Sequence, residues 1–143
     1  MIRALAFCLG GLMLAGMASA QEMAKGDPDA GRRIAGQCRT CHGSDGYAQI
    51  PIAPHIGGEP ASYLIAQLQA FRDGSREHEM MTIVARGLSD ESIADVAAWY
   101  AQHRAVATLA ADPADAPAMC AGCHGDDGIA VIEDVPNLAG ETN

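Results

Sequence analysis

The sequence is poor in basic residues. It contains 9 Lys and Arg among its 143 residues, against 18 Asp and Glu, and its formal net charge is −9. Because nucleic acids and anionic membrane surfaces attract basic proteins, neither is an expected partner of so acidic a chain. A charge of this sign favours partners that present a basic docking face.

The sequence also lacks an apolar run long enough to be a confident membrane span. The apolar run Leu5–Met17 follows the cation of Arg3 and precedes the small residues 18–20. This order is typical of a secretory signal. Residues 1–20 are therefore expected to be a cleaved signal peptide that exports the protein to the periplasm and leaves no stable membrane anchor. Its removal would also remove Cys8.

The four remaining cysteines belong to two copies of the pattern Cys-x-x-Cys-His, at residues 38–42 and 120–124. Two thiols at this spacing can form thioethers with the two vinyl groups of one haem, and the histidine that follows can bind its iron. The pattern therefore predicts two covalently attached haem c groups. The expected attachment residues are Cys38, Cys41, Cys120 and Cys123, and the expected proximal iron ligands are His42 and His124.

The residues that follow the two motifs repeat as well. Residues 42–46 are echoed by residues 124–128, and residues 54–59 are echoed by residues 136–141, always at an offset of 82 positions. No insertion or deletion interrupts this correspondence. The repeat therefore indicates a duplicated haem module.

Two other uses of paired cysteines fit less well. A zinc ribbon usually brings its two Cys-x-x-Cys pairs within about 20 residues of each other, whereas 78 residues separate Cys41 from Cys120. A thioredoxin-type redox pair requires neighbouring strands, and no alternating run of β-branched residues flanks either motif. Both alternatives are weaker than haem attachment.

The rest of the first module has helical patterns. Residues 27–28 are a helix-start signal, and residues 63–71 carry apolar side chains at helical spacing before Gly74. A last helix is expected to begin at Ser89, with acidic residues in its first turn. Residues 43–58 are rich in Gly and Pro, so they are expected to form a loop around the haem edge.

The sixth ligand of the first haem has few candidates. Met80 and Met81 are the only candidate methionines between the two motifs, because Met119 directly adjoins Cys120, and a thioether ligand would raise the reduction potential. His78 could compete for the iron, although its charged neighbours favour a solvated side chain. No Met, His, Cys or Lys follows His124. If residues 21–143 are the mature protein, the second iron is therefore expected to lack a sixth ligand and its haem to be partly exposed.

Other histidines and arginines have ordinary interpretations. His55 occupies the repeat position of Asn137, which favours a polar turn residue over an iron ligand. His103 suits a helix end, where a cation complements the helix dipole. Arg72 and Arg76 could pair with haem propionates or lie solvated at a helix end.

With these motifs the chain resembles the class I cytochromes c, and more narrowly the dihaem cytochromes c4 and the similar cytochrome subunit of flavocytochrome c sulfide dehydrogenase. The resemblance covers the whole first module and the haem-attachment half of the second. It rests on residues 26–31, 38–43, 63–68, 71–76, 88–90 and 93–100, with Met81 eight residues before Ser89.

The resemblance also implies roles for particular residues. It implies that Met81, and not Met80, is the axial ligand of the first haem. It implies that the backbone carbonyls of Pro54 and Pro136 accept hydrogen bonds from the proximal histidines. Finally, it implies that the first and last helices cross through a small residue and an aromatic, at Gly31 against Val96 and Trp99.

The resemblance therefore implies an all-α, class I cytochrome c fold with one complete haem domain and an incomplete second haem module. Its parts are expected at residues 21–104 for the first domain, 105–119 for a linker and 120–143 for the partial second module. Such a protein is expected to carry single electrons between redox proteins and to have no catalytic residues. One alternative is an electron-accepting subunit bound to a sulfide-oxidising flavoprotein. Another is a second haem that binds small ligands or peroxide.

Overall fold

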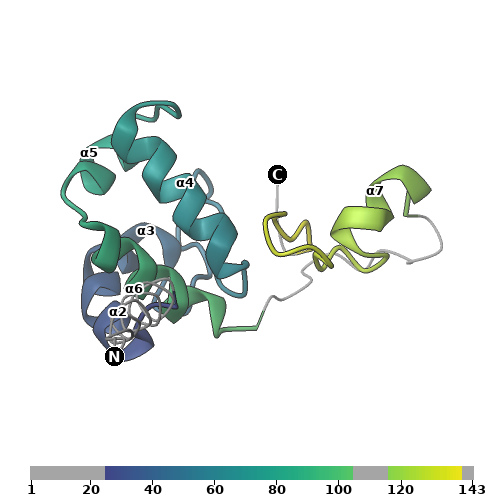
Figure 1. Cartoon of the computed structure of the whole chain (residues 1–143), viewed down its shortest axis with the longest axis horizontal. Coiled ribbons are helices and arrows are strands. Elements are labelled where there is room, and N and C mark those ends of the chain that lie inside the picture. The colour runs from purple at the N-terminus through teal and green to yellow at the C-terminus, as the bar shows by residue number, and fades with distance from the viewer. Residues whose placement is uncertain (1–24, 105–115, 140–143) are drawn as a thin grey trace, which may run out of the picture.

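The computed structural model describes residues 25–104 and 116–139, and every regular element within these two ranges is a helix (Figure 1). This confirms the all-α prediction. None of these helices is long and apolar enough to cross a membrane. The elements are α2 (Pro28–Ile34), η1 (Ala35–Gln37), α3 (Arg39–His42), α4 (Ala61–Asp73), α5 (Met81–Arg86), α6 (Asp90–Ala101) and α7 (Ala118–His124).

Two predicted segments fall largely outside the described residues. The expected signal peptide, residues 1–20, lies outside them completely, as do residues 105–115 of the expected linker. Helix α7 begins at Ala118, two residues before the predicted second module. The difference arises because the helix that carries the second motif starts two residues ahead of its first cysteine.

Helix α2 begins at its sequence signal. The carboxylate of Asp27 accepts a hydrogen bond of 2.9 Å from the backbone N–H of Asp29. Pro28 occupies the first helical position, where a missing N–H removes no helical hydrogen bond. After Ile34 the chain tightens into the turn η1 and continues directly to Cys38. Helix α2 therefore carries the chain into the first haem motif.

Helix α4 ends at the glycine that the sequence predicts. Gly74 has a φ of 85°, in the left-handed region that glycine adopts without steric cost, and its N–H donates to the carbonyl of Ala70 at 3.1 Å. The helix begins at Ala61, two residues before the predicted apolar stripe. Its side chains Leu64 and Phe71 are buried.

Helix α6 also begins as predicted. The hydroxyl of Ser89 accepts a hydrogen bond of 3.1 Å from the N–H of Ser92, which satisfies one of the unpaired donors at the helix start. The first turn carries two acidic residues, which suit the helix dipole. Its apolar side chains Ile93, Val96, Ala97 and Tyr100 are buried.

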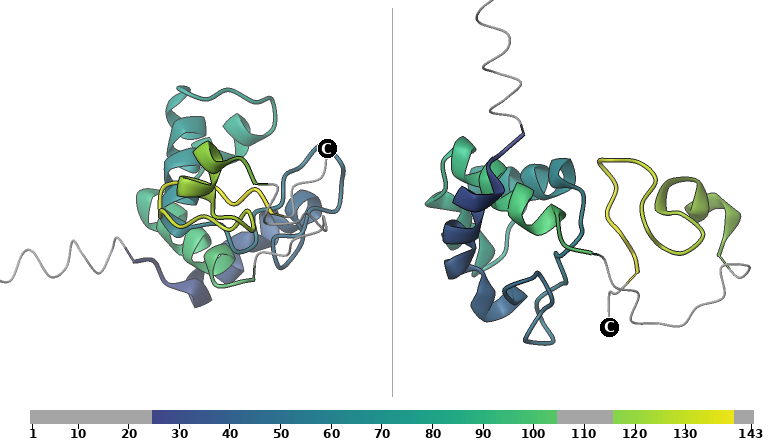
Figure 2. Two further views of the ribbon diagram at one scale, coloured as in Figure 1. Left: turned by 90° about the vertical axis from the view of Figure 1, so that its right-hand side faces the viewer. Right: turned by 90° about the horizontal axis from the view of Figure 1, so that it is seen from below.

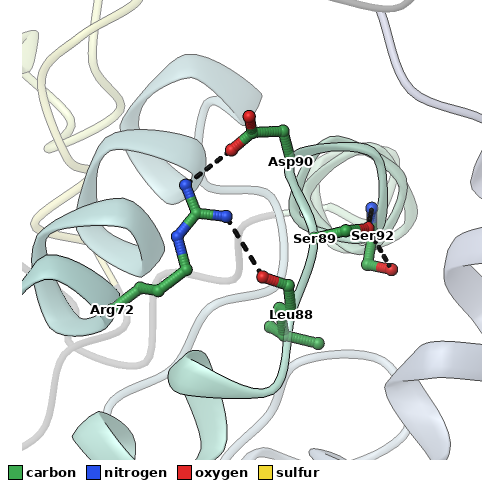
Figure 3. Close-up of polar contacts among 5 residues, drawn as sticks. All are labelled: Arg72, Leu88, Ser89, Asp90 and Ser92. Carbon is green, nitrogen blue, oxygen red and sulfur yellow. Dashed lines mark hydrogen bonds and ion pairs between the residues drawn. The ribbon is translucent and has the colours of Figure 1, made fainter.

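Arg72 connects α4 to the start of α6. Its guanidinium donates to the backbone carbonyl of Leu88 at 3.1 Å and pairs with the carboxylate of Asp90 at 2.5 Å (Figure 3). Arg72 is therefore held by groups of the protein at the end of α4. The contact fixes the turn between α5 and α6.

The core of the first module lies where η1, α4 and α6 meet. Ala35, Leu64, Val96, Ala97 and Tyr100 form one buried cluster. The partly buried Cys38 packs against this cluster. The first haem motif is therefore attached to this core.

Helices α2 and α6 cross at Gly31, as expected, but the contact on α6 differs by one residue. A Cβ atom at Gly31 would lie 2.0 Å from the backbone oxygen of Asp95 and 2.9 Å from the Cβ of Trp99. Val96 faces the core instead. The crossing is reinforced by the Asp95 carboxylate, which accepts from the backbone N–H of Asp27 at 2.7 Å.

The second module consists of α7 and the loop that follows it. In two views the loop lies between α7 and the first module (Figures 1 and 2). Asn137 of this loop is 3 % exposed. Its backbone N–H donates to the carboxylate of Glu59 at 2.9 Å, and its side-chain amide donates to the carbonyl of Gly58 at 2.8 Å. These hydrogen bonds join the two haem-motif loops.

Replacement of Gly31 by Ala should destabilise the protein, because the new methyl group would overlap a backbone oxygen that cannot move away. The free energy of unfolding in urea should fall by about 1–3 kcal/mol. Gly36→Ala is the matched control, since a Cβ there meets no atom within 4 Å. Equal effects of the two substitutions would contradict the proposed crossing.

Candidate functional site

The first Cys-x-x-Cys-His motif occupies the turn from η1 into α3. The backbone N–H of Cys41 donates to the carbonyl of Cys38 at 3.2 Å, and the N–H of His42 donates to the same carbonyl at 3.0 Å. This tight turn keeps both cysteines and the histidine together. Both thiols are free, so neither is consumed by a disulfide.

The ring of His42 is held by a proline carbonyl. Its Nδ1 atom lies 2.9 Å from the backbone oxygen of Pro54, and the side chain is 8 % exposed. A carbonyl oxygen can only accept, so Nδ1 carries the hydrogen and Nε2 keeps a lone pair. A metal-binding histidine has this arrangement, since the hydrogen bond orients the ring and makes its free nitrogen a better donor.

The loop that brings Pro54 to His42 depends on glycine. Gly43 has a φ of 77°, and a Cβ atom there would lie 2.1 Å from the backbone oxygen of Tyr47. The hydroxyl of Tyr100, from α6, donates to the carbonyl of Gly43 at 3.3 Å. The loop is therefore closed internally and anchored to the core.

The second motif repeats this construction. The Nδ1 atom of His124 lies 2.9 Å from the backbone oxygen of Pro136, and Gly125 has a φ of 72°. The N–H of Leu138 donates to the carbonyl of Gly128 at 2.8 Å, as that of Ile56 does to Gly46 at 2.8 Å. The duplication inferred from the sequence is thus present in the backbone and in the position of the histidine ring.

His55 and Asn137 have the same role in the two loops. Nδ1 of His55 accepts from the N–H of Ala48 at 2.7 Å, and Oδ1 of Asn137 accepts from the N–H of Ala130 at 2.8 Å. In both loops a side-chain acceptor closes the turn by binding the backbone N–H seven residues earlier. His55 is therefore a turn residue, as its repeat position predicts.

The two sites differ in their surroundings. Cys38 and Cys41 are partly buried, whereas Cys120 and Cys123 are exposed. Burial raises the pKa of the Cys38 thiol to about 11, an effect that a hydrogen bond with Tyr100 offsets in part. Before a thioether forms, the Cys38 sulfur is therefore a protonated thiol at neutral pH.

The two candidate methionines lie at the start of α5. Met81 is the first residue of the helix and is partly buried, whereas Met80 is 56 % exposed. No sequence pattern predicted α5, which has only six residues. His78 precedes the helix, and its Nδ1 accepts from the N–H groups of Met80 and Met81 at 3.2 and 3.4 Å. His78 is exposed, as expected, and its ring also caps this turn.

The donor set fits haem better than a metal ion held by protein alone. Across residues 25–104 and 116–139, no three His, Cys, Asp or Glu side chains come together as ligands of a metal ion. The two cysteine pairs therefore do not build a zinc site here. Each pair instead lies one residue ahead of a histidine with a free ring nitrogen, which is the donor set that c-type haem requires.

Comparison with known proteins gives a consistent result. No family model matches the chain. The chain is 47% identical over 81 residues to cytochrome c-554(548) of Halomonas halodenitrificans, an alignment that covers 54% of this chain and 98% of that protein. It is 32% identical over 134 residues to cytochrome c4 of Pseudomonas aeruginosa, which covers 82% of this chain and 66% of that protein.

A solved structure and a second group of relatives extend this likeness. Reduced recombinant cytochrome c4 from Pseudomonas stutzeri superposes with a TM-score of 0.69 at 31% identity, over 81% of this chain and 74% of that chain. A thiosulfate dehydrogenase electron acceptor of Thiomonas intermedia is 31% identical over 127 residues, which covers 76% of this chain and 58% of that protein.

The duplicated loops and the relatives indicate the same cofactor. In both Cys-x-x-Cys-His motifs the histidine ring is hydrogen-bonded to a proline carbonyl. The similar protein and the similar solved structure are both cytochromes c4. The chain belongs to the dihaem class I c-type cytochromes, which carry covalently attached haem c and transfer electrons.

Proposed function

We propose that this protein is a periplasmic carrier of single electrons with two haem sites of unequal exposure. In the first, Cys38 and Cys41 would hold the haem and His42 would bind its iron. The corresponding residues of the second site are Cys120, Cys123 and His124. Haem c, when bound, supplies an iron that cycles between the ferric and ferrous states by one electron.

The observation that carries this proposal is the pair of identical contacts behind the histidines. In each site a proline carbonyl lies 2.9 Å from Nδ1 of the histidine. Such a contact fixes the ring in one orientation and one tautomer. A ligand that does not reorient with each electron suits a carrier, since the protein then has little to rearrange.

Met81 is the proposed sixth ligand of the first haem. It begins α5 and is partly buried, whereas the neighbouring Met80 is more than half exposed. The side chain that is already withdrawn from water is the better candidate for an apolar haem face. Its thioether would favour the ferrous state and so raise the reduction potential.

We also propose an oxidoreductase of sulfur compounds as the electron donor. Two of the relatives are named thiosulfate dehydrogenase electron acceptors. The acidic charge of this chain suits a donor with a basic docking face. The alternative is a permanent flavoprotein partner, in which this chain would be the cytochrome subunit of a sulfide-oxidising complex.

The exported protein should contain two covalently bound haems. Haem staining after denaturing electrophoresis and pyridine haemochrome quantitation should give two haems per chain. The double substitution Cys120→Ala and Cys123→Ala should leave one, because thioethers form only at the intact pair. A wild-type protein without covalent haem would overturn the site assignment.

Replacement of Met81 by Ala should remove the weak near-infrared band that arises from sulfur bound to ferric iron. It should also lower the potential of one haem, because a thioether favours the ferrous state. Met80→Ala is the matched control and should leave the band and both potentials nearly unchanged. Loss of the band in Met80→Ala alone would move the ligand by one residue.

Reduction of the protein by a purified thiosulfate dehydrogenase should depend on salt. Opposite charges steer the encounter, so stopped-flow rate constants should fall about tenfold between low and physiological ionic strength. No dependence on salt would contradict a basic docking face. Copurification of a flavin-containing subunit would favour the flavoprotein alternative.

A further inference from the structure

The segment between α4 and α5 is held in place by His78. The backbone N–H of His78 donates to the hydroxyl of Thr82 at 3.0 Å, and its carbonyl accepts from the N–H of Thr82 at 3.0 Å. Its ring nitrogen Nδ1 accepts from the N–H groups of Met80 and Met81 at 3.2 and 3.4 Å. Backbone and ring together fix the first turn of α5.

The hydrogen bonds to the ring nitrogen of His78 satisfy N–H groups at the start of α5, which matters most in a short helix. The first N–H groups of any helix lack partners within the helix. A side-chain acceptor just before the helix compensates for this, and its loss typically weakens the local structure. Because α5 has six residues, its start represents a large part of the whole element.

The ring of His78 is also anchored to α4. It lies edge-on to Phe71, with 6.5 Å between ring centroids, and Phe71 is 7 % exposed. The guanidinium of Arg76 lies over the ring of Phe71, 4.5 Å from its centroid, and donates to the side-chain oxygen of Gln67 at 2.5 Å. His78 therefore connects the start of α5 to a helix of the core. Arg76 takes part in the same cluster and is not a free helix-end cation.

We propose that His78 is a positioning residue for Met81. Its ring accepts a hydrogen bond from the backbone N–H of Met81 and packs against Phe71, and these two contacts fix the position of the Met81 backbone from which the side chain projects. This inference rests on the proposed function, in which Met81 binds the first iron. Without the acceptor, the turn that carries Met81 should open more often, and an added ligand should replace the thioether more easily.

The experiment compares three substitutions of His78 in the complete dihaem protein. His78→Phe keeps an aromatic ring beside Phe71 but has no acceptor. His78→Asn has no ring but keeps an acceptor, since an Asn side chain can bond a backbone N–H two residues on. His78→Ala has neither. Glu77→Gln, at an exposed neighbour, is the matched control.

The measurement is a titration of the ferric protein with imidazole, followed by the loss of the sulfur-to-iron near-infrared band. This band reports only a haem with bound thioether, so the other haem does not interfere. His78→Ala and His78→Phe should bind imidazole about fivefold more tightly than wild type, the effect of losing one helix cap. His78→Asn and Glu77→Gln should stay close to wild type.

The outcomes separate this inference from the assignment of the ligand. Should Met81→Ala retain the band, the ligand assignment fails and the positioning role fails with it. If Met81→Ala loses the band while all three His78 variants bind imidazole like wild type, only the positioning role is overturned. If His78→Phe behaves like wild type and His78→Asn does not, the ring packing matters and the hydrogen bonds do not, which also overturns the proposal.

Discussion

The hydrogen bond between a proximal histidine and a proline carbonyl is the contact on which both sites depend. It ties His42 to Pro54 and His124 to Pro136, each at 2.9 Å across a loop of twelve positions. The loop must fold back tightly for its proline to reach the ring, and the glycine at its start makes this possible. The orientation of the histidine ring therefore depends on the shape of the loop.

The loop of the first site is also anchored to the protein core. Tyr100 is buried in the core cluster, and its hydroxyl holds the carbonyl of Gly43. The backbone carbonyl of the same residue accepts from the N–H of Gly58, at the other end of the loop, at 2.9 Å. One residue of α6 thus holds both ends of the loop. Burial raises the pKa of Tyr100 as well, so its hydroxyl keeps the hydrogen that it donates.

Most of this architecture could be predicted from the sequence because its signals are local. Asp27, Gly74 and Ser89 each mark a helix end through a hydrogen bond to a near neighbour or a backbone conformation. The repeat also predicted the paired loops, since an offset without insertions preserves their geometry. The helix ends need no knowledge of distant parts of the chain, and the repeat needs only a comparison of the sequence with itself.

The features that sequence reasoning missed depend on tertiary contacts. Helix α5 is too short for a periodic pattern, and it is stabilised by a histidine whose charged neighbours suggested a solvated side chain. The crossing at Gly31 involves the carbonyl of Asp95, and no sequence pattern reports which backbone atom faces a glycine. The Asn137 amide also closes its own loop and joins the first module. Loss of this one amide would therefore remove a hydrogen bond that shapes the second loop and one that holds the two modules together.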